Sequence, residues 1–435
     1  MNRSTETPVE DTASATGQAQ SQSLVPLFIV WTGQAFSLLG SKLVGFALVW
    51  YLTVSTGSAT VLAFASLVTV LPRILFGPVA GALVDRWNRR IVMIVADSLI
   101  ALATVVLVVL FALDVIQVWH IYVLNFVRAL GGVFHWPAMQ ASTALMSPEK
   151  HLSRIQGMNQ ILFGTMSILS PAMGALLIDL LPVQGILAID VGTALLAILP
   201  LFFVFIPQPK ITVSGKGATE GKPSVLDDLR QGLHFIRGWP GLLMIIAISV
   251  LVAMLLMPAF SLLPILITGH FGGGALQLAW LQVAYGAGAI VGGLVLSVWG
   301  GFERRIVTML LAMALMGVGF VALGVAPANG LPLAIGALFF SATMESIEVG
   351  SIVAIIQAAV PPELHGRVLA LDIALVTAAA PIGLAIAGPL SNAIGVRPWF
   401  VLGGLVTTAL GVGAFFVPAI IRIEDQVTRN RVKTA

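Results

Sequence analysis

Two carboxylates, Glu345 and Glu348, lie three residues apart within an otherwise apolar stretch of the chain. On a helix this spacing places both side chains on one face. If that face borders a low-dielectric cavity, desolvation and the neighbouring negative charge both favour the protonated form, so a proton can be taken up and released near neutral pH. The pair is therefore a candidate proton carrier. The alternative is a structural pair whose charge is neutralised by Lys42 or Arg128.

Other ionisable residues interrupt apolar stretches in the same way. A charge at the middle of a bilayer costs at least about 2.5–3.5 kcal/mol, so such residues usually face a protein interior or a water-filled cavity. Asp190 is a further candidate for proton handling. Asp97 and Asp372 lie within about two helical turns of one end of their stretches, where we expect them to pair with basic loops at a gate. Arg73 has no evident partner in the sequence.

The elements that must position these residues are transmembrane helices. The chain is 58% hydrophobic and only 9% charged, against roughly 25% charged for a soluble domain. A span needs about 20 apolar residues, and continuous rather than alternating runs favour helices over a barrel. We therefore predict an all-α membrane protein whose 12 transmembrane helices cover residues 24–53, 59–84, 91–113, 118–146, 152–179, 184–206, 241–268, 276–300, 305–326, 330–358, 365–390 and 396–421.

The basic residues predict how these helices cross the membrane. When the segments between them are assigned alternately to two sides, all but four of the 22 Lys and Arg residues fall on the side that holds both termini. Arg397 falls on the other side, and Lys42, Arg73 and Arg128 lie inside the stretches. The positive-inside rule makes the basic side cytoplasmic. Both termini are therefore expected in the cytoplasm.

The chain divides into two similar halves. Arg89-Arg90-Ile91-Val92 recurs as Arg304-Arg305-Ile306-Val307, and two further loop matches, at Pro148 to His151 and at Arg154, recur at nearly the same offset. Because each half has an even number of helices, the halves are expected to be parallel repeats. We predict a cytoplasmic tail at 1–23, six-helix bundles at 24–207 and 241–422, a cytoplasmic linker at 208–240 and a second tail at 423–435.

The linker contains one short segment with a helical pattern. Leu226, Leu229, Leu233 and Ile236 recur at helical spacing, with charged residues off that stripe. The pattern is typical of an amphipathic helix lying on a membrane surface. The alternative is a soluble helix packed on neighbouring loops.

A charged loop between the second and third stretches is a candidate gate. Gly81 permits close approach of helices, and Asp85 can accept hydrogen bonds at a neighbouring helix N-terminus. The arginines that follow can pair with carboxylates or lipid headgroups, so the loop could clamp the two halves in one conformation and release them in the other. The alternative is a basic loop that only sets topology. The arginines concerned are Arg86, Arg89 and Arg90.

The loop resembles a known family. Its pattern G-x-L-x-D-R-x-x-R-R is similar to the signature of the major facilitator superfamily, although the second half has lost the acidic residue. Arg128-Ala129-Leu130-Gly131, Phe134 to Ala138 and Ser147 to Leu152 resemble the macrolide-efflux and siderophore-exporter branch. Ser170-Pro171-Ala172-Met173-Gly174 is similar to an antiporter motif in which Gly replaces the Ser. The resemblance links Arg128 to proton coupling.

The resemblance implies a proton-coupled exporter of amphipathic small molecules, in the plasma membrane of a bacterium, with membrane lipids around it. We expect a monomer that is not an enzyme and needs no cofactor, metal or nucleic acid. The sequence contains no G-x-x-x-x-G-K-[ST] stretch of the kind found in ATPases, so an ion gradient must supply the energy or transport must be passive. The rivals are a lysophospholipid or lipid flippase on the same fold, a transport-inactive sensor and a membrane-embedded enzyme.

The residues predicted to bind substrate are polar, aromatic or methionine side chains within the stretches. Polar groups orient a ligand in a largely apolar pocket, and methionine suits adaptable apolar surfaces, although its helical spacing is equally typical of packing. The set is Gln34, Lys42, Asn125, Trp136, Asn159, Met254 and Met257.

Overall fold

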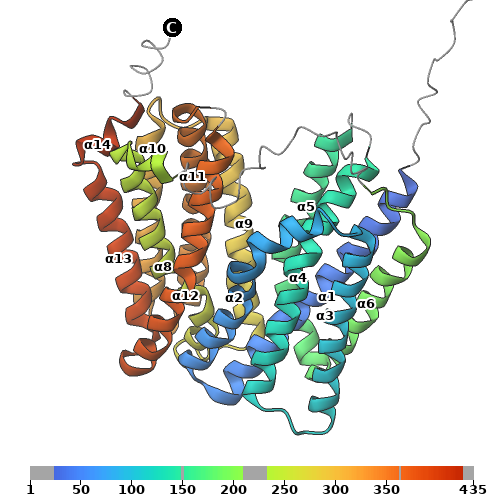
Figure 1. Ribbon diagram of the computed structural model, residues 1–435. Helices are drawn as coiled ribbons and strands as arrows, with labels where there is room; N and C mark the ends of the chain where they lie inside the picture. The colour runs from blue at the N-terminus through green and yellow to red at the C-terminus, as the bar shows by residue number, and fades with distance from the viewer. Residues whose placement is uncertain (1–23, 148–150, 209–232, 362–363, 425–435) are drawn as a thin grey trace, which may run out of the picture.

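The computed structural model describes residues 24–147, 151–208, 233–361 and 364–424. Twelve long helices form two bundles in this part of the chain (Figure 1). The first bundle consists of α1 (Val25–Thr56), α2 (Ala59–Val84), α3 (Arg89–Ala112), α4 (Val118–Met146), α5 (Leu152–Leu180) and α6 (Val183–Phe203). The second consists of α8 (Pro240–Gly269), α9 (Ala275–Trp299), α10 (Arg305–Val325), α11 (Leu331–Ala359), α12 (His365–Ile394) and α13 (Val396–Ala414), followed by the short α14 (Pro418–Ile421).

The helices have the lengths expected of membrane spans. Among the described residues, 11 helices are long and apolar enough to cross a membrane. The twelfth, α4, has 29 residues but carries Asn125, Arg128, His135 and Gln140 within its span. Its polar residues therefore mark a helix that faces the interior of a bundle rather than lipid.

Local sequence sets the ends of the helices. Gly57 ends α1 with a φ of 59°, a left-handed conformation that glycine adopts without steric cost. The Ser58 side chain then caps α2 by accepting a hydrogen bond from the Val61 amide at 3.4 Å. Asn88 caps α3 by accepting hydrogen bonds from the amides of Arg90 and Ile91. These caps satisfy backbone donors that a helix N-terminus leaves free.

The two bundles have different cores. Buried apolar residues of the second bundle form one continuous cluster that reaches across to Phe46, Ala59 and Ala175 of the first bundle. In the first bundle they form three smaller clusters. Glycines allow the close packing of the second core: a Cβ on Gly288 would lie only 2.2 Å from the Phe339 carbonyl oxygen of α11. The apolar interior of the first bundle is therefore divided by polar groups and cavities.

The bundles meet at one end and separate toward the other (Figure 1). We call the end that carries Leu24, Gln208 and Glu424 the linker end and the opposite end the distal end. At the distal end, a Cβ on Gly388 of α12 would lie 3.0 Å from Thr60 Cα of α2. Near the linker end, a Cβ on Gly81, Gly157 or Gly366 would meet no atom within 4 Å. This conformation is therefore open toward the linker end.

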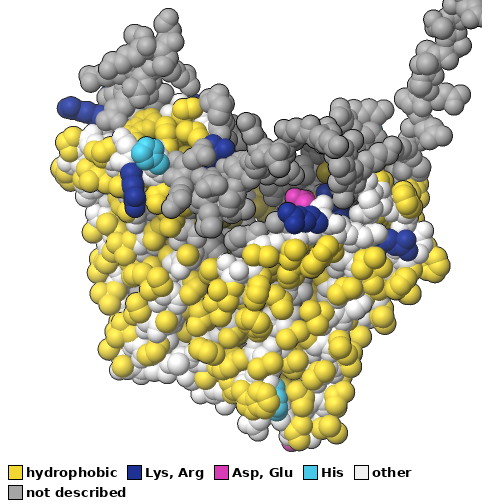
Figure 2. All heavy atoms as spheres, in the orientation of Figure 1, with side chains coloured by type: hydrophobic (Ala, Val, Ile, Leu, Met, Phe, Trp, Pro, Cys, Tyr) yellow, Lys and Arg dark blue, Asp and Glu magenta, His cyan; other side chains and the backbone are white. Residues whose placement is uncertain are grey.

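The outer surface supports a membrane setting. Figure 2 shows hydrophobic side chains over most of the face in view, with Lys and Arg gathered near the linker end. The predicted tail at 1–23 lies outside the described residues, as do 425–435 of the second tail and Leu226 and Leu229 of the linker. Residues 233–237 are helical, and Ile236 is buried in the core of the second bundle. This end of the linker therefore packs on the core of the second bundle rather than on neighbouring loops.

Candidate functional site: a cavity between the two bundles

A cavity of about 650 Å³ opens within the first bundle, where α1, α2, α4 and α5 provide much of the wall. We call it the first-bundle cavity. Its polar lining includes Gln34, Asn125 and Asn159, and its aromatic lining includes Trp31 and Trp136. Trp31 Nε1 donates a hydrogen bond to Asn159 Oδ1 at 2.8 Å, which ties α1 to α5 across the wall. The combination of apolar rings with a few fixed polar groups is typical of a small-molecule site.

A second cavity of about 510 Å³ adjoins the first and reaches the other bundle. We call it the inter-bundle cavity. Both cavities have Ser41, Lys42, Asn125 and Phe163 in their walls. The inter-bundle cavity adds Phe260, Ser261 and Gln282 from α8 and α9. Because Lys42 lies near the midpoint of α1, the shared wall lies near the middle of the membrane.

The structure brings five of the seven predicted substrate residues into this space. Gln34, Lys42, Asn125, Trp136 and Asn159 all line the first-bundle cavity. Met254 and Met257 are not part of the lining of either cavity. A Cβ on Gly383 of α12 would lie only 2.1 Å from the Met254 carbonyl oxygen, so this part of α8 packs tightly against α12.

Arg128 and Asp190 form a buried ion pair inside the first bundle. Arg128 Nη1 of α4 lies 2.6 Å from Asp190 Oδ2 of α6, and Asp190 is only 1% exposed. Thr104 of α3 and Ser41 of α1 donate hydrogen bonds to the same carboxylate at 2.9 and 3.1 Å. Arg128 also donates to Thr104. Four helices are thus joined at Asp190, and its charge is balanced where an unpaired one would be costly.

Asp97 is also held within the first bundle. Gln34 Nε2 donates a hydrogen bond to Asp97 Oδ2 at 2.9 Å. His135 Nε2 lies 3.3 Å from Asp97 Oδ1, but not in hydrogen-bonding geometry. The expectation that Asp97 pairs with the basic loop is therefore wrong for this conformation. Its position along α3 was a correct guide to its depth but gave no information about the direction in which it points.

The carboxylates of the second bundle have a different environment. Tyr285 of α9 donates a hydrogen bond to Glu345 Oε2 at 2.7 Å, and Tyr285 packs edge-on against Phe260 at 4.7 Å. Glu348 lies within electrostatic reach of Glu345 and Asp372. Among the described residues, no cation forms an ion pair with any of these three acids. Asp372 Oδ1 is buried without a hydrogen bond, so its expected pairing with a basic loop is wrong in this conformation.

Among the described residues, the polar contacts of the charged loop after α2 lie within its own bundle. Arg89 Nη2 lies 3.7 Å from Asp85 Oδ1, whose side chain is 75% exposed. Arg89 also donates to the Ala141 carbonyl of α4 at 3.3 Å, and Arg90 donates to the carbonyls of Leu201 and Phe202 at the end of α6. The expected contacts of Asp85 with a neighbouring helix N-terminus, and of Gly81 with a close helix, are absent among the described residues because the bundles separate here.

Contacts at the distal end close the space on that side, and sequence reasoning missed them. Asn392 near the end of α12 accepts a hydrogen bond from the Ala59 amide at 2.9 Å. It donates to Ser58 and Thr60 at 3.2 and 2.9 Å. Ser261 of α8 donates to Ser66 of α2 at 2.7 Å. Asn392 therefore caps α2 from the other bundle.

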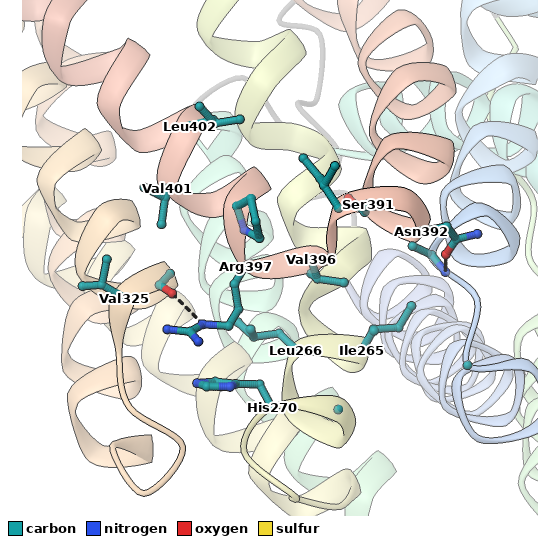
Figure 3. A pocket seen from close by; sticks show the side chains of 17 residues that line it. Ile265, Leu266, His270, Val325, Ser391, Asn392, Val396, Arg397, Val401 and Leu402 are labelled. Atoms are coloured by element: carbon teal, nitrogen blue, oxygen red, sulfur yellow. Dashed lines mark hydrogen bonds between the residues drawn. The ribbon is translucent and has the colours of Figure 1, made fainter.

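A separate pocket of about 900 Å³ lies at this distal end. Figure 3 shows Asn392 on the side of the first bundle and Arg397 on the other side, next to His270. Arg397 Nε donates to the Gly324 carbonyl at 3.0 Å, and His270 Nε2 lies 2.8 Å from the Ala326 carbonyl. Both polar side chains thus contact backbone carbonyls at the C-terminal end of α10.

Two parallel six-helix repeats around a polar cavity near the middle of the membrane define a class of transporters. A family model described as Major Facilitator Superfamily matches residues 30–371 and again residues 245–432. The chain belongs to this superfamily.

Individual relatives are consistent with this placement. The chain is 32% identical over 385 residues to Macrolide efflux protein A of Streptococcus pyogenes, covering 88% of this chain and 94% of that protein. It is 27% identical over 412 residues to Multidrug efflux pump Tap of Mycolicibacterium fortuitum, covering 92% and 97%. The solved structure of the nucleoside transporter NupG superposes with a TM-score of 0.68 at 12% identity, covering 89% of this chain and 98% of that one. This last similarity shows the fold.

Proposed function

We propose that the protein is a secondary active transporter that exports amphipathic small molecules, such as macrolide-like drugs or siderophores, in exchange for protons. The observation that carries the proposal is the pair of adjoining cavities near the middle of the helices, walled by both bundles and lined by aromatic and polar side chains. The names of the relatives, Macrolide efflux protein A and Multidrug efflux pump Tap, support export of drugs. One chain walls both cavities, so a monomer suffices.

The orientation of the chain sets the side from which the cavity loads in this conformation, and the names of the relatives support export. With the linker end in the cytoplasm, as the positive-inside rule favours, both termini are cytoplasmic and the cavities open toward the cell interior. A substrate then enters the first-bundle cavity from the cytoplasm or the inner leaflet. Rocking of the bundles breaks the contacts of Asn392 and closes the linker end, so the same cavity opens to the outside.

Proton coupling is assigned to the second bundle. Glu345 and Glu348 lie near the midpoint of α11, and no cation pairs with them among the described residues. Binding of a proton removes a charge that is costly in this setting, so proton occupancy and conformation become linked. Arg128 and Asp190 are the other candidates, but protonation of Asp190 would have to break an existing ion pair.

Gating is assigned to the charged loop. In the outward-open state the bundles approach at the linker end, where Gly81 leaves room for a neighbouring helix. Asp85 and the arginines after it would then contact the second bundle. In the present conformation Asp85 is exposed, and the contact with the second bundle is not formed among the residues that the structure describes.

Reconstitution tests the function directly. Purified protein in liposomes, with an imposed pH gradient, is tested against macrolides, a siderophore and a labelled lysophospholipid. We expect proton-dependent, concentrative movement of a macrolide or siderophore. Movement of the lipid alone would support a flippase instead. Transport of a substrate at a rate independent of the pH gradient would show that transport is not coupled to protons.

A further inference from the structure

Lys42 of α1 and Arg73 of α2 present two positive charges to the first-bundle cavity. Both side chains are exposed, and both lie near the midpoint of their helices. Among the described residues, neither forms an ion pair, and the charge of Arg73 acts on Lys42. Two like charges near the middle of a membrane are costly in free energy. A cavity lowers this cost because water or a ligand can contact the charged groups.

The acids of the first bundle balance these charges only in part. Asp190 is paired with Arg128, and Asp97, which lines the same cavity, is one carboxylate against the two cations and is hydrogen-bonded by Gln34. Glu345, Glu348 and Asp372 of the second bundle are absent from the lining of both cavities. The space beside Lys42 and Arg73 therefore has an excess of positive charge, which favours an anion.

The same cavity offers an apolar surface next to the charges. Trp136 is 42% exposed and packs edge-on against Phe163 with ring centroids 5.0 Å apart. Phe163, Lys42 and Asn125 lie in the wall that both cavities share. A molecule with an aromatic or alicyclic body and one anionic group would contact the rings and the cations at the same time.

We propose that Lys42 and Arg73 form an anion subsite for a carboxylate, sulfonate or phosphate group of an amphipathic substrate. Arg73 can bind two oxygens of the group through its planar guanidinium, and Lys42 adds a compact charge. The apolar body of the substrate lies against Trp136 and Phe163. This assignment rests on the proposed function and narrows it to anionic amphipathic molecules, such as siderophores, rather than the amine-bearing macrolides.

A matched pair of fluorescent probes tests the subsite. Anilinonaphthalene sulfonate carries an anion, and phenylnaphthylamine has a closely related ring system without it. Both are titrated against the purified protein in lipid nanodiscs. We expect Lys42→Gln and Arg73→Gln each to weaken binding of the sulfonate about tenfold, the effect of losing one hydrogen bond to a charged group. The affinity for the neutral probe should stay unchanged.

The controls separate charge from folding. Arg237→Gln removes an exposed positive charge outside the spans and should leave both affinities unchanged. Lys42→Arg and Arg73→Lys keep the charge and should keep most of the preference for the sulfonate, even if a glutamine variant folds poorly. Equal affinity of the parent and of the glutamine variants for the sulfonate would overturn the proposal.

Transport measurements on the same proteins distinguish failure of the anion subsite from failure of the proposed transport function. If the variants lose export but bind the sulfonate like the parent, the cations act by pairing with the second bundle on closure, and the subsite is overturned. If the parent binds the sulfonate through Lys42 and Arg73 but exports nothing, the proposed function fails and the subsite stands.

Discussion

The two bundles share one architecture but treat their intramembrane charges differently. In the first bundle, Asp190 is paired with Arg128, and Asp97 is held by Gln34. In the second bundle, the one polar partner of Glu345 in the described part of the chain is the Tyr285 hydroxyl. Glu348 has no hydrogen bond among the described residues and lies near two other acids. The apolar cores differ in parallel, since the second is one continuous cluster and the first is divided.

This difference indicates a division of labour within a duplicated fold. A bundle whose acids are already paired can keep a fixed wall and offer its remaining cations and aromatic rings to a ligand. A tightly packed bundle with unpaired acids can change its charge by binding protons without disturbing a salt bridge. We infer that the first bundle mainly binds substrate and the second mainly carries the proton.

The largest effect on stability should come from breaking the buried ion pair of Arg128 and Asp190. Arg128→Met leaves Asp190 buried without its cation, and loss of one partner of a buried pair costs about 3–5 kcal/mol. We expect a large fall in the apparent Tm in detergent, followed by tryptophan fluorescence. The double variant Arg128→Met/Asp190→Leu should recover most of it, because no unpaired charge remains. A single variant as stable as the parent would show that the pair does not hold the bundle together.

A smaller loss of stability is expected from a substitution where α1 packs against α6. A Cβ on Gly40 would lie 2.2 Å from Thr193 Oγ1 and 2.9 Å from Asp190 Oδ1, whereas a Cβ on Gly45 would meet nothing within 4 Å. Gly40→Ala should therefore destabilise the protein by about 1–3 kcal/mol, and Gly45→Ala in the same helix is the matched control. Equal thermal stability of the two variants would mean that the contact relaxes without cost.

The distal contact between the bundles should affect conformation more than stability. Asn392→Ala removes three hydrogen bonds between α12 and the start of α2, each with a net contribution of about 0.5–1.5 kcal/mol. The population should shift toward the outward-open state, measured by spin labels on the distal ends of α2 and α12. Asn392→Asp keeps the acceptor for the Ala59 amide and should shift it less. An unchanged distance distribution in Asn392→Ala would show that Asn392 does not hold the distal ends of the bundles together.

The smallest effect on stability is expected at Asp85. Its side chain is 75% exposed, and surface substitutions usually change stability by about 0.5 kcal/mol or less. Asp85→Asn should therefore fold and bind substrate like the parent but transport slowly, because the contact it makes on closure is lost. Transport at the parental rate would leave the loop with a role in topology alone.

The sequence predicted the number of helices and the depth of the charged residues, because apolar runs and helical rise depend on local composition. It did not predict partners, because depth along a helix does not give the direction of a side chain. Asp97 accordingly pairs inside its own bundle, and Met254 packs against α12 rather than lining a cavity. Asn392 was missed because its partners are more than 300 residues away and it lies at a helix end without a local motif.

The assignment of the proton to the second bundle is tested most directly by the double variant Glu345→Gln/Glu348→Gln in liposomes with an imposed pH gradient. The measurement is concentrative export alongside substrate exchange without a pH gradient. We predict that exchange persists, because the first-bundle cavity is intact, while uphill export is lost. Full uphill export by the double variant would show that these glutamates are structural and would move the search for the proton site to Asp190 and Asp97.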